Sequence, residues 1–147
     1  MTTTQTTPRT ILQGGRAKAY RPIPAADRQA AFEAAIAAYE RGDYFEAHEL
    51  LEPAWMGTAD IGERELYQGL IKVAAAFVHG VRGNPRGIAR NLEGARARLV
   101  SAMDAGAAAG DIDLVALVND VDDRLARLVA DPTDQTLTAP ALTRTAR

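Results

Sequence analysis

Three residues of the short stretch "AHELLE" (47–52) carry side chains that could do chemistry. His48 and Glu52 are four residues apart, so on a helix they project from one face, while Glu49 is turned by about 100° from His48. An imidazole and two carboxylates can bind a divalent cation, and they can also exchange protons near neutral pH. The chain has only one other histidine, His79, so either kind of site would draw on these residues.

A structural interpretation of the same residues is the one we favour. A half-buried histidine that donates to a glutamate or a backbone carbonyl can hold two helices in one packing register. The spacing of 4, 3 and 4 residues predicts a single inward-facing stripe made of Tyr44, His48, Leu51 and Trp55. On this stripe Glu52 lies within reach of the imidazole, and Glu49 lies nearer the edge.

Metal binding is the second interpretation, with His48, Glu52 and His79 as candidate ligands. The pattern is His-Glu-x-x-Glu rather than the His-Glu-x-x-His of zinc enzymes. If the second and third helices are antiparallel, position 48 lies opposite about position 71, and His79 lies about 12 Å further along the axis. We therefore predict no cofactor and keep a divalent metal as an alternative.

A small-molecule pocket between the second and third helices is the third interpretation. Gln68 and Lys72 lie at the level of the cluster, and a partly apolar cleft with a few convergent polar groups is typical of ligand sites. A lysine that faces two glutamates could perturb their pKa values for acid–base work, although a weak salt bridge is the simpler role. We see no nucleophile with a positioned base, so no catalytic residue is predicted. The predicted lining comprises Tyr44, His48, Glu49, Glu52, Trp55, Gln68, Lys72 and His79.

Five helices are predicted to position these residues. The 3.6-residue periodicity and the end signals favour helices at about 25–41, 43–55, 63–81, 84–103 and 113–129. Gly42 ends the first helix, Asp43 caps the second, and Asn84 followed by Pro85 starts the fourth. Pro53 lies inside the second helix, where its missing N–H predicts a kink or an early end.

These elements predict the fold class and the domain organisation. No segment alternates with period two for long, so we expect no sheet, and short loops imply antiparallel helical hairpins. We predict an all-α fold, a compact bundle of about five helices in one domain at 23–130. A flexible basic arm at 1–22 and a flexible tail at 131–147 are expected to be disordered.

Composition excludes several classes of protein. The 147 residues suit one domain, and the absence of cysteine excludes disulfides and thiolate metal sites. The longest apolar run, at 70–81, is too short for a membrane span and contains Lys72. The first ten residues have no hydrophobic region, so we expect a cytoplasmic protein.

Charge distribution bears on the partners. Residues 27–65 hold ten acids and three bases, whereas residues 72–98 hold six bases and one acid. We expect helices of opposite charge to lie side by side, and we do not expect nucleic-acid binding because no aromatic platform accompanies the scattered bases. The stretch "RGNPRG" (82–87) could hold an anion, but a plain cap and turn is favoured. The alanine-rich stretch 30–40 could pair with a second copy as a homo-oligomer.

Two blocks of the chain resemble the domain-of-unknown-function 309 family of bacteria and archaea. They are "YFEAHELLEPAW" (44–55) and "YQGLIKVAAAFVHGVRGNPRGIARNL" (67–92), within a similar region at about 28–100. The resemblance implies a small all-helical cytosolic protein and implies no established activity or cofactor. Lys72 stands where relatives would carry glutamine, which implies a neutral hydrogen-bonding row in the family. The matching motif positions are Tyr44, Phe45, Glu46, His48, Glu49, Glu52, Trp55, Gln68, Gly69, Leu70, His79, Gly83 and Asn84.

The favoured function is a non-catalytic interaction or small-ligand-binding module. Its polar and aromatic groove would lie between the second and third helices. The alternative is a metal-dependent or acid–base enzyme with hydrolase-like chemistry, built on His48, Glu49 and Glu52.

Overall fold

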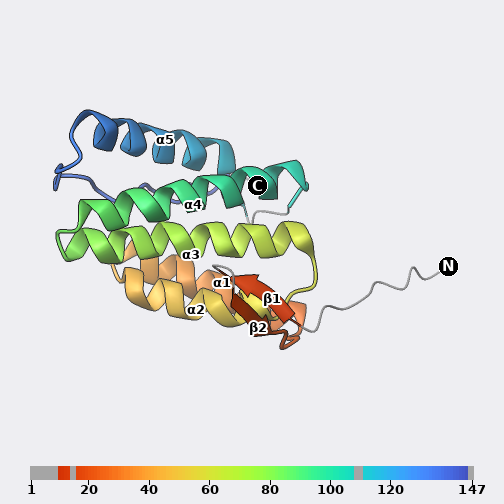
Figure 1. The fold of residues 1–147 in the computed structure, drawn as a ribbon. Coiled ribbons are helices and arrows are strands. Elements are labelled where there is room, and N and C mark those ends of the chain that lie inside the picture. Colours follow the sequence, from red (N-terminus) through yellow and green to blue (C-terminus); the bar gives the residue numbers. More distant parts are fainter. Residues whose placement is uncertain (1–9, 14–15, 108–110, 146–147) are drawn as a thin grey trace.

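The part of the chain that the structure describes forms five α-helices and one short β-hairpin (Figure 1). The computed structural model describes residues 10–13, 16–107 and 111–145. The elements are β1 (Thr10–Gln13), β2 (Arg16–Ala19), α1 (Ala25–Glu40), α2 (Tyr44–Met56), α3 (Ile61–Val81), α4 (Pro85–Asp104) and α5 (Leu114–Ala130).

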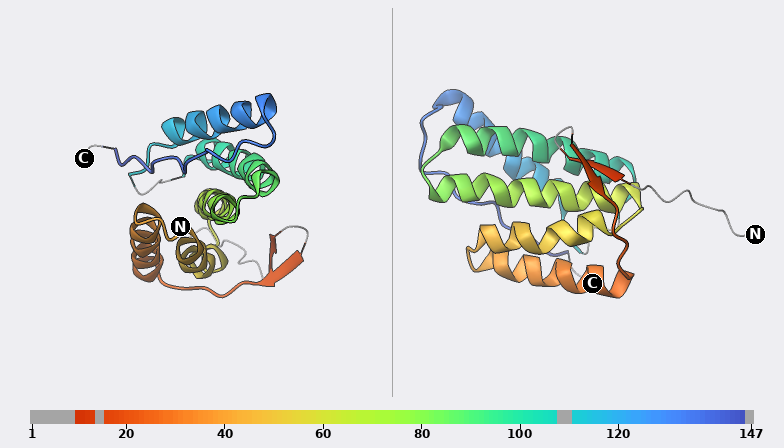
Figure 2. Two further views of the ribbon diagram at one scale, coloured as in Figure 1. Left: turned by 90° about the vertical axis from the view of Figure 1, so that its left-hand side faces the viewer. Right: turned by 60° about the horizontal axis from the view of Figure 1, so that its bottom comes forward.

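The helices pack in the order in which they occur along the chain. Helix α3 lies between α2 and α4, α1 packs against α2, and α5 packs against α4 (Figure 2). The predicted all-α bundle of antiparallel hairpins is confirmed. Apolar faces with helical spacing build the core, whose largest fully buried side chains include Phe32, Trp55, Leu66, Leu92, Leu99 and Leu117.

The β-hairpin departs from the prediction that the chain has no sheet. Strands β1 and β2 pair antiparallel, with Thr10 opposite Ala19 and Gln13 opposite Arg16. Main-chain bonds from Arg21 N–H to the Met56 carbonyl, at 3.1 Å, and from Ile23 N–H to Gly57 then attach the chain to the end of α2. Four-residue strands are too short to show a clear alternation. The rest of the predicted flexible arm, residues 1–9 and 14–15, lies outside the described residues.

Helix ends follow the predicted caps closely. The Asp43 carboxylate accepts from the Glu46 N–H at 3.1 Å, and the Asn84 side chain accepts from the Gly87 N–H at 3.2 Å. Asp60 caps α3 in the same way, so this helix starts two residues earlier than predicted, at Ile61. The alternative that α2 ends early at Pro53 is wrong, because α2 continues to Met56.

The segment after α5 corrects the expectation of a loose tail, since residues 131–145 lie across the helices with Leu137, Pro140 and Leu142 buried. The Tyr39 hydroxyl donates to the Pro140 carbonyl at 2.5 Å. The Arg144 guanidinium donates to both carboxylate oxygens of Glu33, at 2.9 and 3.1 Å. We call residues 131–145 the C-terminal strap.

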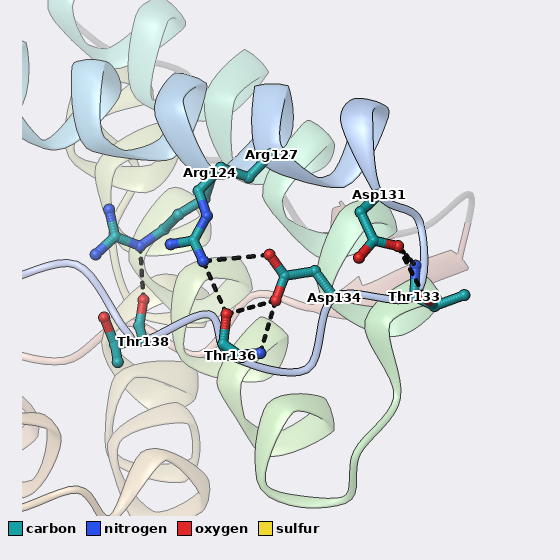
Figure 3. A network of polar contacts seen from close by, with 7 residues as sticks. All are labelled: Arg124, Arg127, Asp131, Thr133, Asp134, Thr136 and Thr138. Atoms are coloured by element: carbon teal, nitrogen blue, oxygen red, sulfur yellow. Dashed lines mark hydrogen bonds and ion pairs between the residues drawn. The ribbon is translucent and has the colours of Figure 1, made fainter.

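Local polar contacts direct the strap away from α5 (Figure 3). The Asp134 carboxylate accepts from the Thr136 N–H at 2.7 Å, and Arg127 donates to the Thr136 hydroxyl at 2.9 Å. Arg124 donates to the Thr138 carbonyl at 2.6 Å. Aspartate and threonine side chains that bond the nearby backbone make tight turns, which is why a threonine-rich segment can be ordered here.

Candidate functional site

A surface pocket lies between the first turns of α2 and the last turns of α3. Its volume is about 160 Å³, and we call it the histidine pocket. A neighbouring hollow of about 250 Å³ shares Phe45, Val78 and Arg82 with it and extends to Gly42 and Val81. The histidine pocket is lined by Phe45, His48, Ala75, Val78, His79 and Arg82.

The pocket brings together two histidines that the sequence analysis had placed at different levels. The predicted separation of about 12 Å counted backbone positions only. Helical side chains tilt toward the N-terminus of their own helix. Because α2 and α3 are antiparallel, the side chains of His48 and His79 tilt toward each other and line one pocket.

His79 is positioned by the start of α4. Its ring lies over Gly87, where an added Cβ would meet the His79 Cγ at 2.4 Å. Its Nδ1 lies 3.2 Å from the side-chain nitrogen of Asn84, the residue that caps α4. Nδ1 faces an amide nitrogen, which can only donate, so the imidazole proton belongs on Nε2. A metal ligand needs a lone pair at Nε2, so this arrangement does not suit His79 for metal binding.

His48 lies at the edge of the bundle, with 27% of its side chain exposed. Its Nδ1 is 3.2 Å from Oε1 of Glu49, which is the exposed neighbour rather than the predicted partner Glu52. His48, Glu49 and Glu52 each offer one ligand atom within 4.8 Å of the others. The three candidate residues are therefore close together at the edge of the bundle, where His48 and Glu52 are half-buried and Glu49 is exposed.

Two of the predicted lining residues belong to the core instead. Trp55 is 1% exposed and Gln68 is 4% exposed, and neither lines the histidine pocket. The Oε1 atom of Gln68 is buried without a hydrogen-bond partner among the described residues. Tyr44 is half-buried, with its ring 5.2 Å from that of Tyr39, and it lines only the neighbouring hollow.

Lys72 turns toward α4 rather than toward the carboxylates of α2. A Cβ added at Gly94 would meet the Lys72 Cδ at 3.0 Å, so the lysine stem lies across α4. Burial lowers the pKa of Lys72, and the charge of Arg98 lowers it further. The lysine side chain therefore packs against α4, whereas the predicted contact with Glu49 or Glu52 would have taken it toward α2.

Five residues of this site were not in the predicted lining: Phe45, Ala75, Val78 and Arg82, which line the pocket, and Gly87, which lies under the His79 ring. Phe45 had the clearest sequence signal, because it precedes His48 by three residues and therefore shares its face. It is 59% exposed, which is unusual for a large aromatic side chain. The role of Gly87 had no sequence signal, because it depends on the approach of the His79 ring from another helix.

A second polar cluster, between α1 and α3, is internally satisfied. Arg28 donates to Glu63 at 2.6 Å, and the Tyr67 hydroxyl donates to the same carboxylate oxygen at 2.8 Å. Burial and this hydrogen bond raise the pKa of Tyr67. These groups line a pocket of about 190 Å³ but already have partners, which indicates a structural role.

Fold and site together define the class: an all-α protein of five successively packed helices with a shallow pocket that contains both histidines. Residues 32–91 match the model of the family described as "Domain of unknown function (DUF309)". The match includes the histidine pocket and Gly87, and it excludes α5 and the C-terminal strap. No curated protein and no solved structure matches the chain. Within the described residues, no helix is long and apolar enough to cross a membrane.

Proposed function

We propose that this protein is a non-catalytic small-ligand-binding module and that the histidine pocket is its binding site. The observation that carries the proposal is the convergence of His48, His79 and the exposed Phe45 from two helices on one pocket. Each imidazole has its Nδ1 near a neighbouring side chain, and among the described residues neither Nε2 atom has a hydrogen-bond partner, so both can contact a ligand. Exposed aromatic surface beside oriented polar groups is typical of small-molecule sites.

The lining favours binding over catalysis. It contains no hydroxyl or thiol group that could act as a nucleophile. Lys72, the residue that could have supported acid–base chemistry, turns away toward Gly94.

Fragment screening by NMR tests the proposal. We expect some small aromatic fragments to shift the amide resonances of Phe45, Val78 and His79, with dissociation constants of roughly 1 mM for fragments of this size. Phe45→Ala should abolish these shifts. Val115→Ala, which trims another exposed apolar residue on α5, should leave them unchanged. A diverse set of fragments that leaves all these resonances in place would contradict the proposal.

A divalent cation held by His48, Glu49 and Glu52 is a second candidate, and it would support hydrolase-like chemistry. The supporting observation is the approach of their three ligand atoms to within 4.8 Å. Titration of tag-free protein with Zn²⁺ or Mn²⁺, followed by calorimetry, tests it. Stoichiometric binding that is lost in His48→Ala and retained in His79→Ala is the expected result.

The proposal also covers the cellular location of the protein and its assembly with a second copy. We place the protein in the cytoplasm, without nucleic-acid partners. The alanine-rich outer face of α1, with Ala30, Ala34 and Ala37 exposed, is the surface on which a second copy would pack. Light scattering of the wild type and of an Ala34→Glu variant tests this homo-oligomer.

A further inference from the structure

We propose that the ligand of the histidine pocket carries a carboxylate on a small apolar body, an inference that rests on the proposed function of this pocket. The carboxylate lies between the Nε2–H of His79 and the guanidinium of Arg82. The apolar body lies against Phe45 and Val78, which line both the pocket and the neighbouring hollow.

The donor character of His79 follows from the cap of α4. The Asn84 side chain accepts from the Gly87 N–H with its oxygen, so its nitrogen must be the atom that faces His79. Reversing the amide would place two donors against each other at Gly87. Nδ1 of His79 therefore accepts, and Nε2 carries the proton. Gly87 allows this orientation of the ring, because the His79 ring occupies the space in which any other residue would have its Cβ.

Arg82 provides the second donor. It is exposed at the C-terminal end of α3, and it forms no ion pair within the part of the chain that the structure describes. A guanidinium presents two parallel N–H groups that match the two oxygens of a carboxylate. A ring N–H beside such a fork favours an anion over a neutral group.

The nearby carboxylates do not occupy these donors. Glu49 lies against the Nδ1 of His48, and Asp43 accepts from the Glu46 N–H. Glu46 in turn pairs with Arg41. The cationic group of Arg82 is thus left for an external anion.

Benzoate and its neutral analogue benzamide are the probes that test the inference, titrated into the full chain at pH 8 and followed by amide NMR. We expect benzoate to shift Phe45, Val78 and His79, with benzamide at least tenfold weaker. Arg82→Gln should reduce benzoate affinity about tenfold and leave benzamide affinity unchanged.

Asn84→Asp tests the role of the tautomer. Aspartate caps a helix as well as asparagine does, but its carboxylate accepts from Nδ1–H and so moves the proton of His79 away from Nε2. We expect the ring ¹⁵N shifts of His79 to report this change and benzoate affinity to fall at least tenfold. Gln135→Glu adds the same charge near Gly83 without contacting His79 and should change the affinity less than about threefold.

The outcomes separate the two proposals. If benzamide binds in the pocket as well as benzoate does, the carboxylate inference is overturned and the pocket remains a ligand site. If Asn84→Asp and Gln135→Glu weaken benzoate equally, charge alone is responsible and the role of the tautomer is overturned. If neither probe nor any other fragment shifts the pocket resonances, both proposals fail.

Discussion

At the residue scale, the missing side chain of Gly87 leaves the space that the ring of His79 occupies. An alanine at most helix positions is more favourable than glycine by about 0.5–1 kcal/mol. At Gly87, however, the new Cβ would overlap the ring of His79 at 2.4 Å from Cγ. We expect Gly87→Ala to lower the free energy of unfolding by roughly 1–3 kcal/mol in urea denaturation.

Gly94 on the same helix provides the matched control. A Cβ there meets the flexible stem of Lys72 at 3.0 Å, which can move aside. Gly94→Ala should therefore be neutral or stabilising by about 0.5 kcal/mol. Equal effects of the two substitutions would mean that the His79 ring does not depend on the space at Gly87.

Lys72 gives a prediction about pH. Because burial and Arg98 lower its pKa from 10.5, the folded state holds fewer protons than the unfolded state as the pH approaches 10.5, and this residue's contribution to stability rises across that window. Lys72→Met removes the charge, and we expect it to stabilise the protein at pH 7 by roughly 0.5 kcal/mol. The advantage should shrink in urea denaturation between pH 7 and pH 10. An advantage that does not change with pH would show that lost charge is not its cause.

At the scale of elements, the C-terminal strap has the role of a sixth packing element. Leu142 is buried against a small apolar hollow lined by residues of α1, α2 and α3, among them Ile36, Leu51 and Leu70. Leu142→Ala should lower the free energy of unfolding by about 2–4 kcal/mol, because it leaves a cavity between these helices. Chemical denaturation measures this, with the exposed neighbour Thr143→Ala as the control, for which we expect less than about 0.5 kcal/mol.

At the scale of the whole molecule, the strap links the two ends of the stack of helices. It leaves α5, returns across the bundle and reaches α1 through Tyr39 and Glu33. A chain that ends at Ala130 loses three buried side chains, and we expect a loss of roughly 5 kcal/mol relative to a chain that ends at Thr145. Native-state hydrogen exchange should show the largest loss of protection in α1. A truncated chain with unchanged protection there would show that the strap does not stabilise the stack.

Most of the fold follows from the sequence for a local reason. The helix starts at Asp43 and Asn84 and the end at Gly42 depend on a few neighbouring residues, and each was predicted. Apolar spacing of three and four also predicted the buried faces, because burial is the main stabilising term for such helices. The short hairpin of β1 and β2 was missed because four residues carry too little periodicity.

The strap was missed for a different reason. Its composition is that of a loose segment. Its few apolar residues stabilise the protein because they are buried against the helices, as Leu142 is in the hollow between α1, α2 and α3. The site was predicted in part for a related reason. Local spacing identified His48 and the nearby carboxylates, but it did not show that His48 and His79 line one pocket.

By itself, the sequence determined the helices, their buried faces and the grouping of His48 with Glu49 and Glu52, since all of these depend on neighbours within one or two turns. Only the tertiary structure decided which side chains from different helices meet. Because α2 and α3 are antiparallel, the side chains of His48 and His79 tilt toward each other and line one pocket. The missing side chain of Gly87 leaves room for the ring of His79, and Lys72 packs against Gly94 of α4 instead of facing the carboxylates of α2. Such outcomes depend on the relative placement of whole helices, which no single stretch of sequence specifies.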